Sequence, residues 1–244
     1  MTISYISSSV GWAASTPDIT VTAPASIQDD DLLLAFYSNS YQSGVDDGTP
    51  VTLSGFTKIN DVFAGSGTDI TAACFWKIAS SETGNYDMSA DVVGGGTQRT
   101  TGAIIVLRGV DTTTPLDVAF VEANHWDKAI NSATPTPKPI TTDTDNAWVV
   151  LWGCTLFSHV SACNPVSGYD ERVEQVVNNG NVEICTKLIP TASTTETPGA
   201  FPHTDIDSSN ETGMYTLAIK EASAGGSVVP SLSQGYSRYT GKLT

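Results

Sequence analysis

Three histidines are the side chains of this 244-residue sequence best suited to general acid–base catalysis at neutral pH. His125, His159 and His203 each lie in a polar or loop-like stretch, without a serine or cysteine nucleophile motif nearby. GxSxG, HExxH and P-loop motifs do not occur in the sequence. We therefore predict that the protein is not an enzyme, that it has no catalytic residues and that it needs no cofactor.

Carboxylates form clusters that could bind calcium or supply the two acids of a glycosidase. The clusters are residues 29–31, 46–47, 143–145 and 205–207. Each resembles the entry to a turn, where an aspartate side chain accepts hydrogen bonds from nearby backbone N–H groups. Because no EF-hand or RTX pattern accompanies the clusters, we favour solvated turns over calcium binding and predict no metal site.

The cysteines lack the spacing of a metal centre. They form no CxxC pair, and no histidine lies at a zinc-ligand distance from them in the sequence. Cys74, Cys154 and Cys185 lie in apolar, strand-like runs, whereas Cys163 does not. We favour buried, reduced thiols over a disulfide or a metal role for these three residues.

Aromatic side chains near predicted loops could stack on sugar rings or contact a partner. Tyr41 and Trp126 are the candidates for such glycan- or partner-binding loops, and Tyr37 and Trp12 also lie near predicted loops. A second set of aromatic residues lies within apolar strands and is predicted to belong to the core. This set is Trp76, Trp148 and Trp152.

The charge of the chain excludes two classes of partner. The net charge is −15 at pH 7, so the chain would repel nucleic acid and anionic membranes, which bind lysine and arginine. The first residues have neither the basic nor the apolar region of a signal peptide, and no apolar run approaches the about 18 residues of a membrane-spanning helix. We expect synthesis in the cytoplasm, with neither nucleic-acid nor membrane partners.

The elements that must position these residues are predicted to be β-strands. Hydrophobic residues make up 40% of the chain and charged residues only 15%, and short apolar or alternating runs are separated by Gly, Asn, Asp, Pro and Ser. This pattern indicates an all-β protein with an antiparallel β-sandwich. The predicted strands are residues 19–21, 32–37, 56–63, 70–78, 103–107, 147–156, 170–177, 182–189 and 214–219.

Two halves of the chain repeat the same order of motifs. The pseudo-repeats span residues 1–112 and 113–221, with landmark pairs about 112 positions apart. Each half would have an apolar face that the other can cover, either as two units packed face to face or as interleaved strands. We favour one fused, jelly-roll-like sandwich for residues 1–221. The landmark pairs are Gly55 with Gly168, Lys77 with Lys187, Ile104 with Tyr215, and Trp12 with Trp126.

The C-terminal segment, residues 222–244, differs from the rest of the chain. It has no acidic residue but contains Arg238 and Lys242, together with Tyr236 and Tyr239. We predict an extended docking arm, which binds its own body or a neighbouring subunit through these four side chains. The alternative is a terminal strand of the same sandwich.

The order of motifs in residues 17–220 resembles that of β-sandwich proteins from tailed bacteriophages. The chain reads DDDLLLAF, GFTKI, CFWKIA, IIVLRGVDTTTPLD and TDTDNAWVV, where members of this group often read GDLLLA, GWT, WKxA, YRGVDxxxPxD and TxDGALVV. The resemblance implies a structural part of the virion: a capsid decoration or cement protein, a head fibre or a tail component. It implies no catalytic residues.

The function expected from this resemblance is that of a capsid decoration protein that stabilises the phage head. Its partners would be the major capsid protein or neighbouring virion subunits, and symmetry favours a homo-oligomer, with a trimer preferred. The alternative is an adsorption module on a tail or fibre that binds a receptor or glycan. A hydrolase is the least favoured alternative.

Overall fold

Every predicted strand is present in the computed structural model, which describes residues 2–41, 51–64, 69–90, 98–130, 134–156, 164–177, 180–201 and 211–223. One element, α1, is a helix, and it is a single turn. In chain order the elements are β1 (Ser4–Ala13), β2 (Ile19–Val21), β3 (Leu32–Tyr41), β4 (Thr52–Leu53), β5 (Thr57–Ala64), β6 (Asp69–Ile78), β7 (Tyr86–Ser89), β8 (Gln98–Arg108), α1 (Glu122–His125), β9 (Trp126–Ile130), β10 (Ile140–Thr141), β11 (Ala147–Leu156), β12 (Asp170–Val177), β13 (Gly180–Ile189), β14 (Thr195–Glu196) and β15 (Glu211–Ile219).

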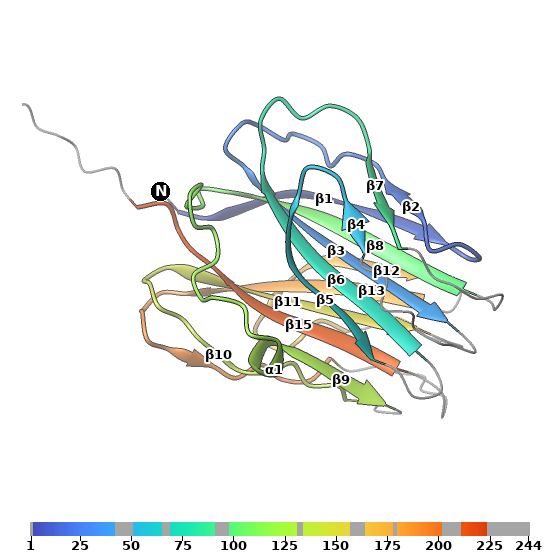
Figure 1. Ribbon diagram of the computed structural model, residues 1–244. Helices are drawn as coiled ribbons and strands as arrows, with labels where there is room; N and C mark the ends of the chain where they lie inside the picture. Colours follow the sequence, from blue (N-terminus) through green and yellow to red (C-terminus); the bar gives the residue numbers. More distant parts are fainter. Residues whose placement is uncertain are drawn as a thin grey trace, which may run out of the picture.

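Two five-stranded antiparallel sheets form the body of the molecule (Figure 1). The first sheet has the order β1-β8-β3-β6-β5, and the second has the order β12-β13-β11-β15-β9. All neighbouring strands within both sheets are antiparallel. The prediction of an all-β antiparallel sandwich is therefore confirmed.

The strand order of the second sheet repeats that of the first. Read from its other edge, the second sheet runs β9-β15-β11-β13-β12, so that β3 corresponds to β11 at the centre and β1 to β9 at an edge. Each sheet is built from one half of the chain. The halves therefore pack face to face, and their strands do not alternate between sheets as they would in an interleaved jelly roll.

Local details of the edge strands β5 and β12 also repeat. The register of β5 against β6 shifts after Lys58, and that of β12 against β13 shifts after Glu171. The glycines that precede these strands, Gly55 and Gly168, both have left-handed backbones, with φ values of 79° and 83°. Glycine tolerates this conformation because it has no Cβ.

Each glycine is followed by an aromatic ring that lies beneath a lysine. The Nζ of Lys77 is 5.7 Å from the centre of the Phe56 ring, and the Nζ of Lys187 is 5.4 Å from the centre of the Tyr169 ring. Lys77 also pairs with Glu82 at 2.7 Å. The GFTKI and CFWKIA motifs thus form one packing unit.

One of the four landmark pairs is wrong by a single residue. Tyr215 pairs with Trp152 across β15 and β11, and the corresponding pair in the first sheet is Ala103 with Phe36. Ala103 is therefore the equivalent of Tyr215. Ile104 points to the opposite face of its sheet, because successive residues of a strand alternate between faces.

The pairing of Trp12 with Trp126 is also wrong. Trp126 lies opposite Tyr215, and Val10 lies opposite Ala103, so Val10 is the equivalent of Trp126. Trp12 lies two residues farther along β1, inside a strand and not before one. The shared residue type of the two tryptophans was misleading.

The main core lies between the two sheets. Phe36 and Trp152 occupy equivalent places and stack on each other, with ring centres 5.3 Å apart, and Trp152 also stacks on Tyr215 at 5.0 Å. Contact between equivalent residues places an approximate two-fold axis between β3 and β11, along the strands. Cys74 and Cys154 are buried, free thiols in this core.

Smaller layers cover the outer faces of both sheets (Figure 1). The three-stranded sheet β2-β7-β4 covers the first sheet, with Met88 packed among Tyr37 and Phe75. The two-stranded sheet β10-β14 lies against the second sheet, where Ile140 of β10 joins Phe201 and Cys185 in a hydrophobic cluster. The predicted reduced and buried state of Cys74, Cys154 and Cys185 is confirmed, and Cys163 lies outside the described residues.

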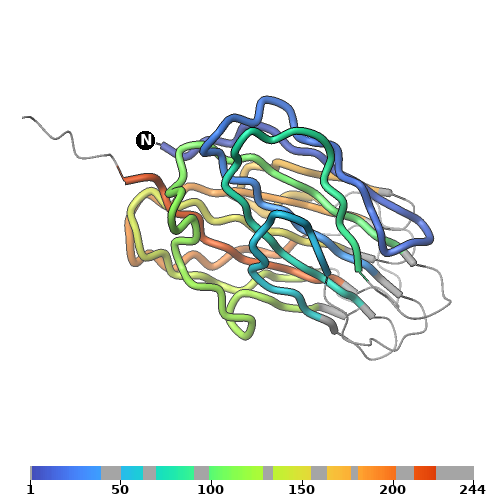
Figure 2. The backbone as a smooth tube through the Cα atoms, turned by 45° about the horizontal axis from the view of Figure 1, so that its top comes forward, coloured from blue at the N-terminus to red at the C-terminus, as the bar shows by residue number. Residues whose placement is uncertain are grey.

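Both ends of the described chain lie at one end of the sandwich, which we call the turn end (Figure 2). A Cβ on Gly109 would lie 2.6 Å from the carbonyl oxygen of Thr2, and the N–H of Ala222 donates to the carbonyl of Gly109 at 2.9 Å. Among the described residues, no helix is long and apolar enough to cross a membrane.

Candidate functional site

A cleft of about 490 Å³ opens at the turn end of the sandwich. Four carboxylates and one guanidinium line it, so its walls are acidic. The charged lining residues are Asp29, Asp30, Asp31, Asp111 and Arg108. Two of the sequence motifs, DDDLLLAF and IIVLRGVD, meet in this cleft.

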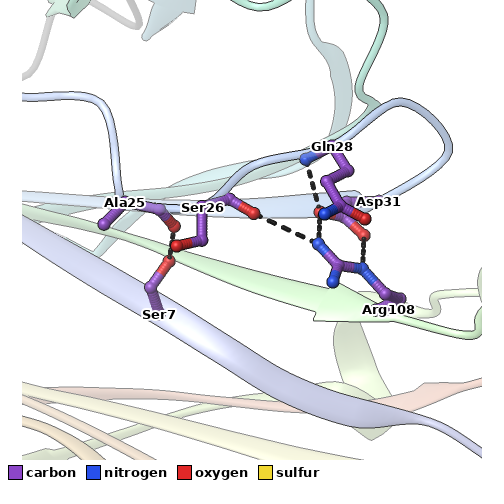
Figure 3. A network of polar contacts seen from close by, with 6 residues as sticks. All are labelled: Ser7, Ala25, Ser26, Gln28, Asp31 and Arg108. Carbon is purple, nitrogen blue, oxygen red and sulfur yellow. Dashed lines mark hydrogen bonds and ion pairs between the residues drawn. The ribbon is translucent and has the colours of Figure 1, made fainter.

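Asp31 and Arg108, which both line the cleft, form a bidentate ion pair (Figure 3). The Nε and Nη2 of Arg108 donate to the two oxygens of Asp31 at 2.7 and 2.8 Å. Asp31 is only 1% exposed, and the backbone N–H of Gln28 donates to it at 2.8 Å. The hydrogen bonds to Asp31 raise the pKa of Arg108 above its ordinary value.

The turn before β3 holds this pair in place. Ser26 and Asp30 have left-handed backbones, with φ values of 62° and 70°. The carbonyl of Ser26 accepts a hydrogen bond from Nη2 of Arg108 at 3.1 Å, and the hydroxyl of Ser7 donates to the carbonyl of Ala25 at 2.5 Å (Figure 3). The arginine therefore ties the turn to the end of β8, and β1 holds it from the other side.

Aspartates of two clusters accept backbone hydrogen bonds. The predicted bond within the aspartate's own turn is present at Asp31, which accepts from the N–H of Gln28, but Asp29 and Asp145 bond to loops distant in the sequence. The Oδ1 of Asp29 accepts a hydrogen bond from the N–H of Ser81 at 2.6 Å. In the second half, the Oδ1 of Asp145 accepts one from the N–H of Ala192 at 2.7 Å. The clusters at residues 46–47 and 205–207 lie outside the described residues.

Asp111 forms the opposite wall of the cleft. Its Oδ1 accepts hydrogen bonds from the N–H groups of Thr114 and Thr113, each at 2.9 Å, and its Oδ2 lies 3.2 Å from the Nζ of Lys220. The backbone hydrogen bonds, chiefly that of Thr114, lower the pKa of Asp111. The carboxylate therefore stays ionised and holds the loop that follows β8.

The chain leaves the body at the rim of the cleft. Glu221 forms an isolated antiparallel β-bridge with Val110, and Ala222 and Ser223 line the cleft. The predicted binding side chains of the arm lie beyond this point, outside the described residues. They are Tyr236, Arg238, Tyr239 and Lys242.

The lining of the cleft is mostly negatively charged. Both oxygens of Asp31 already accept charge-assisted hydrogen bonds from Arg108. Asp29 and Asp30 are exposed at the rim, so the cleft presents negative charge to solvent. A basic side chain of a partner would complement this charge.

The predicted aromatic loop residues whose side chains the structure describes do not form a platform. Trp126 begins β9, is only 8% exposed and packs against Tyr215 with ring centres 4.7 Å apart. The absence of a side chain at Gly213 leaves room for the indole. Tyr37 is also buried, the side chain of Tyr41 lies outside the described residues, and Trp12 is 48% exposed. The assignment of Trp126 to a binding loop is wrong.

One of the three histidines lies within the described residues. His125 is buried, and its Nδ1 accepts a hydrogen bond from the N–H of Val121 at 2.9 Å. Burial lowers the pKa of this imidazole. His159 and His203 lie outside the described residues.

Comparisons of the chain with protein-family models, with curated proteins and with solved structures give no match. Within the described ranges, no group of three or more His, Cys, Asp and Glu side chains is placed to hold a metal ion.

Proposed function

We propose that the protein is a bacteriophage capsid decoration protein, which stabilises the head by binding the capsid surface. The sandwich of residues 1–221 is its rigid body, and residues 222–244 are its docking arm. The partner is the major capsid protein or a neighbouring virion subunit, and the protein acts in the virion as a homo-oligomer, preferentially a trimer.

The observation that supports this proposal is the position of the last described residues at the turn end. Glu221 and Ala222 are bonded to Val110 and Gly109, so the chain is held at a fixed point beside an acidic cleft where the proposed arm begins. The arm carries two basic residues and no acidic one, so its charge is opposite to that of the body. An adhesive segment on a stable scaffold is the arrangement that a decoration protein needs.

The experiment compares the full chain with a variant that ends at Ser223. This end point keeps the contacts of Glu221 and Ala222, so the melting temperature should stay within about 2 °C of that of the full chain. Both proteins are incubated with phage heads that lack the protein, and bound protein is measured by co-sedimentation. We expect the full chain to bind and the truncated protein to lose binding.

A second variant separates charge from length. Replacing Arg238 and Lys242 by alanine should weaken binding, most strongly at low salt, where charge attraction is least screened. Equal binding by the full and truncated chains would contradict the role of the arm. Electron microscopy that places the protein on the tail would overturn the decoration role and favour the adsorption module.

A further inference from the structure

The outer face of β13 carries two buried polar side chains with unmet hydrogen-bonding capacity. Asn181 is 1% exposed, and Glu183 is fully buried. Neither polar atom of the Asn181 amide has a hydrogen-bond partner among the described residues, and neither does Oε2 of Glu183. Buried polar atoms are normally paired, so each unpaired atom calls for an explanation.

The other half of the chain shows that the fold does not require these residues. In the first sheet, the strand equivalent to β13 is β6, and the positions of Asn181 and Glu183 are occupied there by Thr71 and Ala73. Ala73 is buried in an apolar cluster. The second sheet therefore has a carboxylate and an amide at positions where the first sheet has small side chains.

A second carboxylate faces Glu183 across the sheet. Glu174 of β12 lies directly opposite Glu183 in the register, so both side chains lie on the outer face, with their Cβ atoms about 5 Å apart. Like charges in such a pair repel each other. Burial raises the pKa of Glu183 to about 8, and the charges of Glu171 and Glu174 contribute, although a hydrogen bond from the Cys185 thiol acts in the opposite direction.

We propose that Glu183, Glu174 and Asn181 form a binding site for a divalent cation of the calcium type. Carboxylate and amide oxygens are the ligands that Ca²⁺ prefers, and Ca²⁺ completes its shell with water and backbone carbonyls. The cation would neutralise the opposed carboxylates and would bind Oε2 of Glu183 and the amide oxygen of Asn181. Oε1 of Glu183 keeps its hydrogen bond from the thiol of Cys185, at 3.1 Å.

The test is calorimetric titration of the full chain with CaCl₂ at pH 7. With two carboxylates and one amide, we expect a dissociation constant on the order of 0.1–1 mM. Glu183→Gln, which is isosteric and neutral, should weaken binding at least tenfold. Asn181→Ala should weaken binding roughly threefold to tenfold, because it removes one neutral ligand.

The matched control is Glu171→Gln, on the neighbouring strand β12 and exposed to solvent. It makes the same chemical change but lies opposite Cys185 and not opposite Glu183, so binding should stay within about threefold of the unmodified chain. The proposal is overturned if the unmodified chain binds no calcium at 5 mM, roughly five times the highest expected dissociation constant. Equal binding by the Glu183→Gln and Glu171→Gln variants would also overturn it, because it would indicate surface binding alone.

Discussion

Burial of Glu183 couples the stability of the protein to pH. The pKa of this carboxyl is about 8 in the folded chain, above its ordinary value of 4.5. A group whose pKa is raised by folding keeps its proton to a higher pH in the folded state than in the unfolded state. The contribution of Glu183 to the free energy of unfolding is therefore complete below pH 4.5 and is lost as the pH rises toward 8. At pH 7 the loss amounts to roughly 3 kcal/mol.

We therefore predict that Glu183→Gln stabilises the protein at neutral pH. The glutamine keeps the shape of the side chain but cannot ionise, so the gain in the free energy of unfolding should be roughly 2–3 kcal/mol at pH 7 and near zero at pH 4. Urea denaturation of both proteins at the two pH values, with a chelator present, measures the difference. A gain of equal size at both pH values would show that ionisation of Glu183 is not its cause.

At the scale of elements, the same three side-chain types pack together in both edge hairpins, β5-β6 and β12-β13: a glycine, an aromatic ring and a lysine. In the first half the lysine, Lys77, also forms an ion pair with Glu82, whose side chain is 6% exposed. Burial alone would raise the pKa of Glu82, but hydrogen bonds from Lys77, Ser80 and Tyr86 lower it below its ordinary value. In the second half the equivalent pair, Lys187 with Glu196, is more exposed.

Lys77→Met should accordingly destabilise the protein by about 1–2 kcal/mol, because it removes the cation over Phe56 and leaves Glu82 without its counterion. The effect should be largest at neutral pH and should shrink at acidic pH as Glu82 becomes protonated. Thermal unfolding measures the loss. Lys187→Met should have a smaller effect, and the double variant Lys77→Met/Glu82→Gln should recover part of the stability. A larger effect at position 187 would contradict this ranking.

The sequence was sufficient to predict the strands that carry apolar residues, such as β6 and β11, because alternation and apolar runs are local signals. It was not sufficient for β1, whose SYISSSVGWA segment is rich in serine. An edge strand such as β1 has a neighbour on one side only, so it needs fewer apolar residues.

Pairs that depend on register were harder to predict. The ion pair of Asp31 with Arg108 joins residues 77 positions apart, and no local pattern indicates that the two side chains meet. The same difficulty affected Trp126, whose burial depends on Gly213 in a neighbouring strand. Likewise, the single-residue error at Ile104 arose because residue type alone does not identify the face of a strand.

At the scale of the whole molecule, each sheet supplies the cover for the other. The inner faces meet in one core, which contains Phe36 from the first half and Trp152 and Tyr215 from the second. A sheet alone would expose its inner face to water, and the loss of that burial exceeds the stability of a typical domain. The two halves should therefore fold only together.

We predict that fragments 1–112 and 113–244 are unfolded or aggregated alone and form a native-like complex when mixed or co-expressed. The break falls in an exposed loop, between Thr112 and Thr113. Co-purification, circular dichroism and the fluorescence of Trp152 report the assembly. A fragment that unfolds cooperatively as a monomer would contradict the prediction.

The nearness of Thr2 and Ala222, which both lie against Gly109, has a practical consequence. A module whose first and last residues are neighbours can be spliced into a surface loop of another protein, because the host chain leaves and returns at almost the same place. Residues 2–223 should therefore fold as an insert in a carrier protein, joined through short flexible linkers. The opposite end of the sandwich would then project away from the carrier.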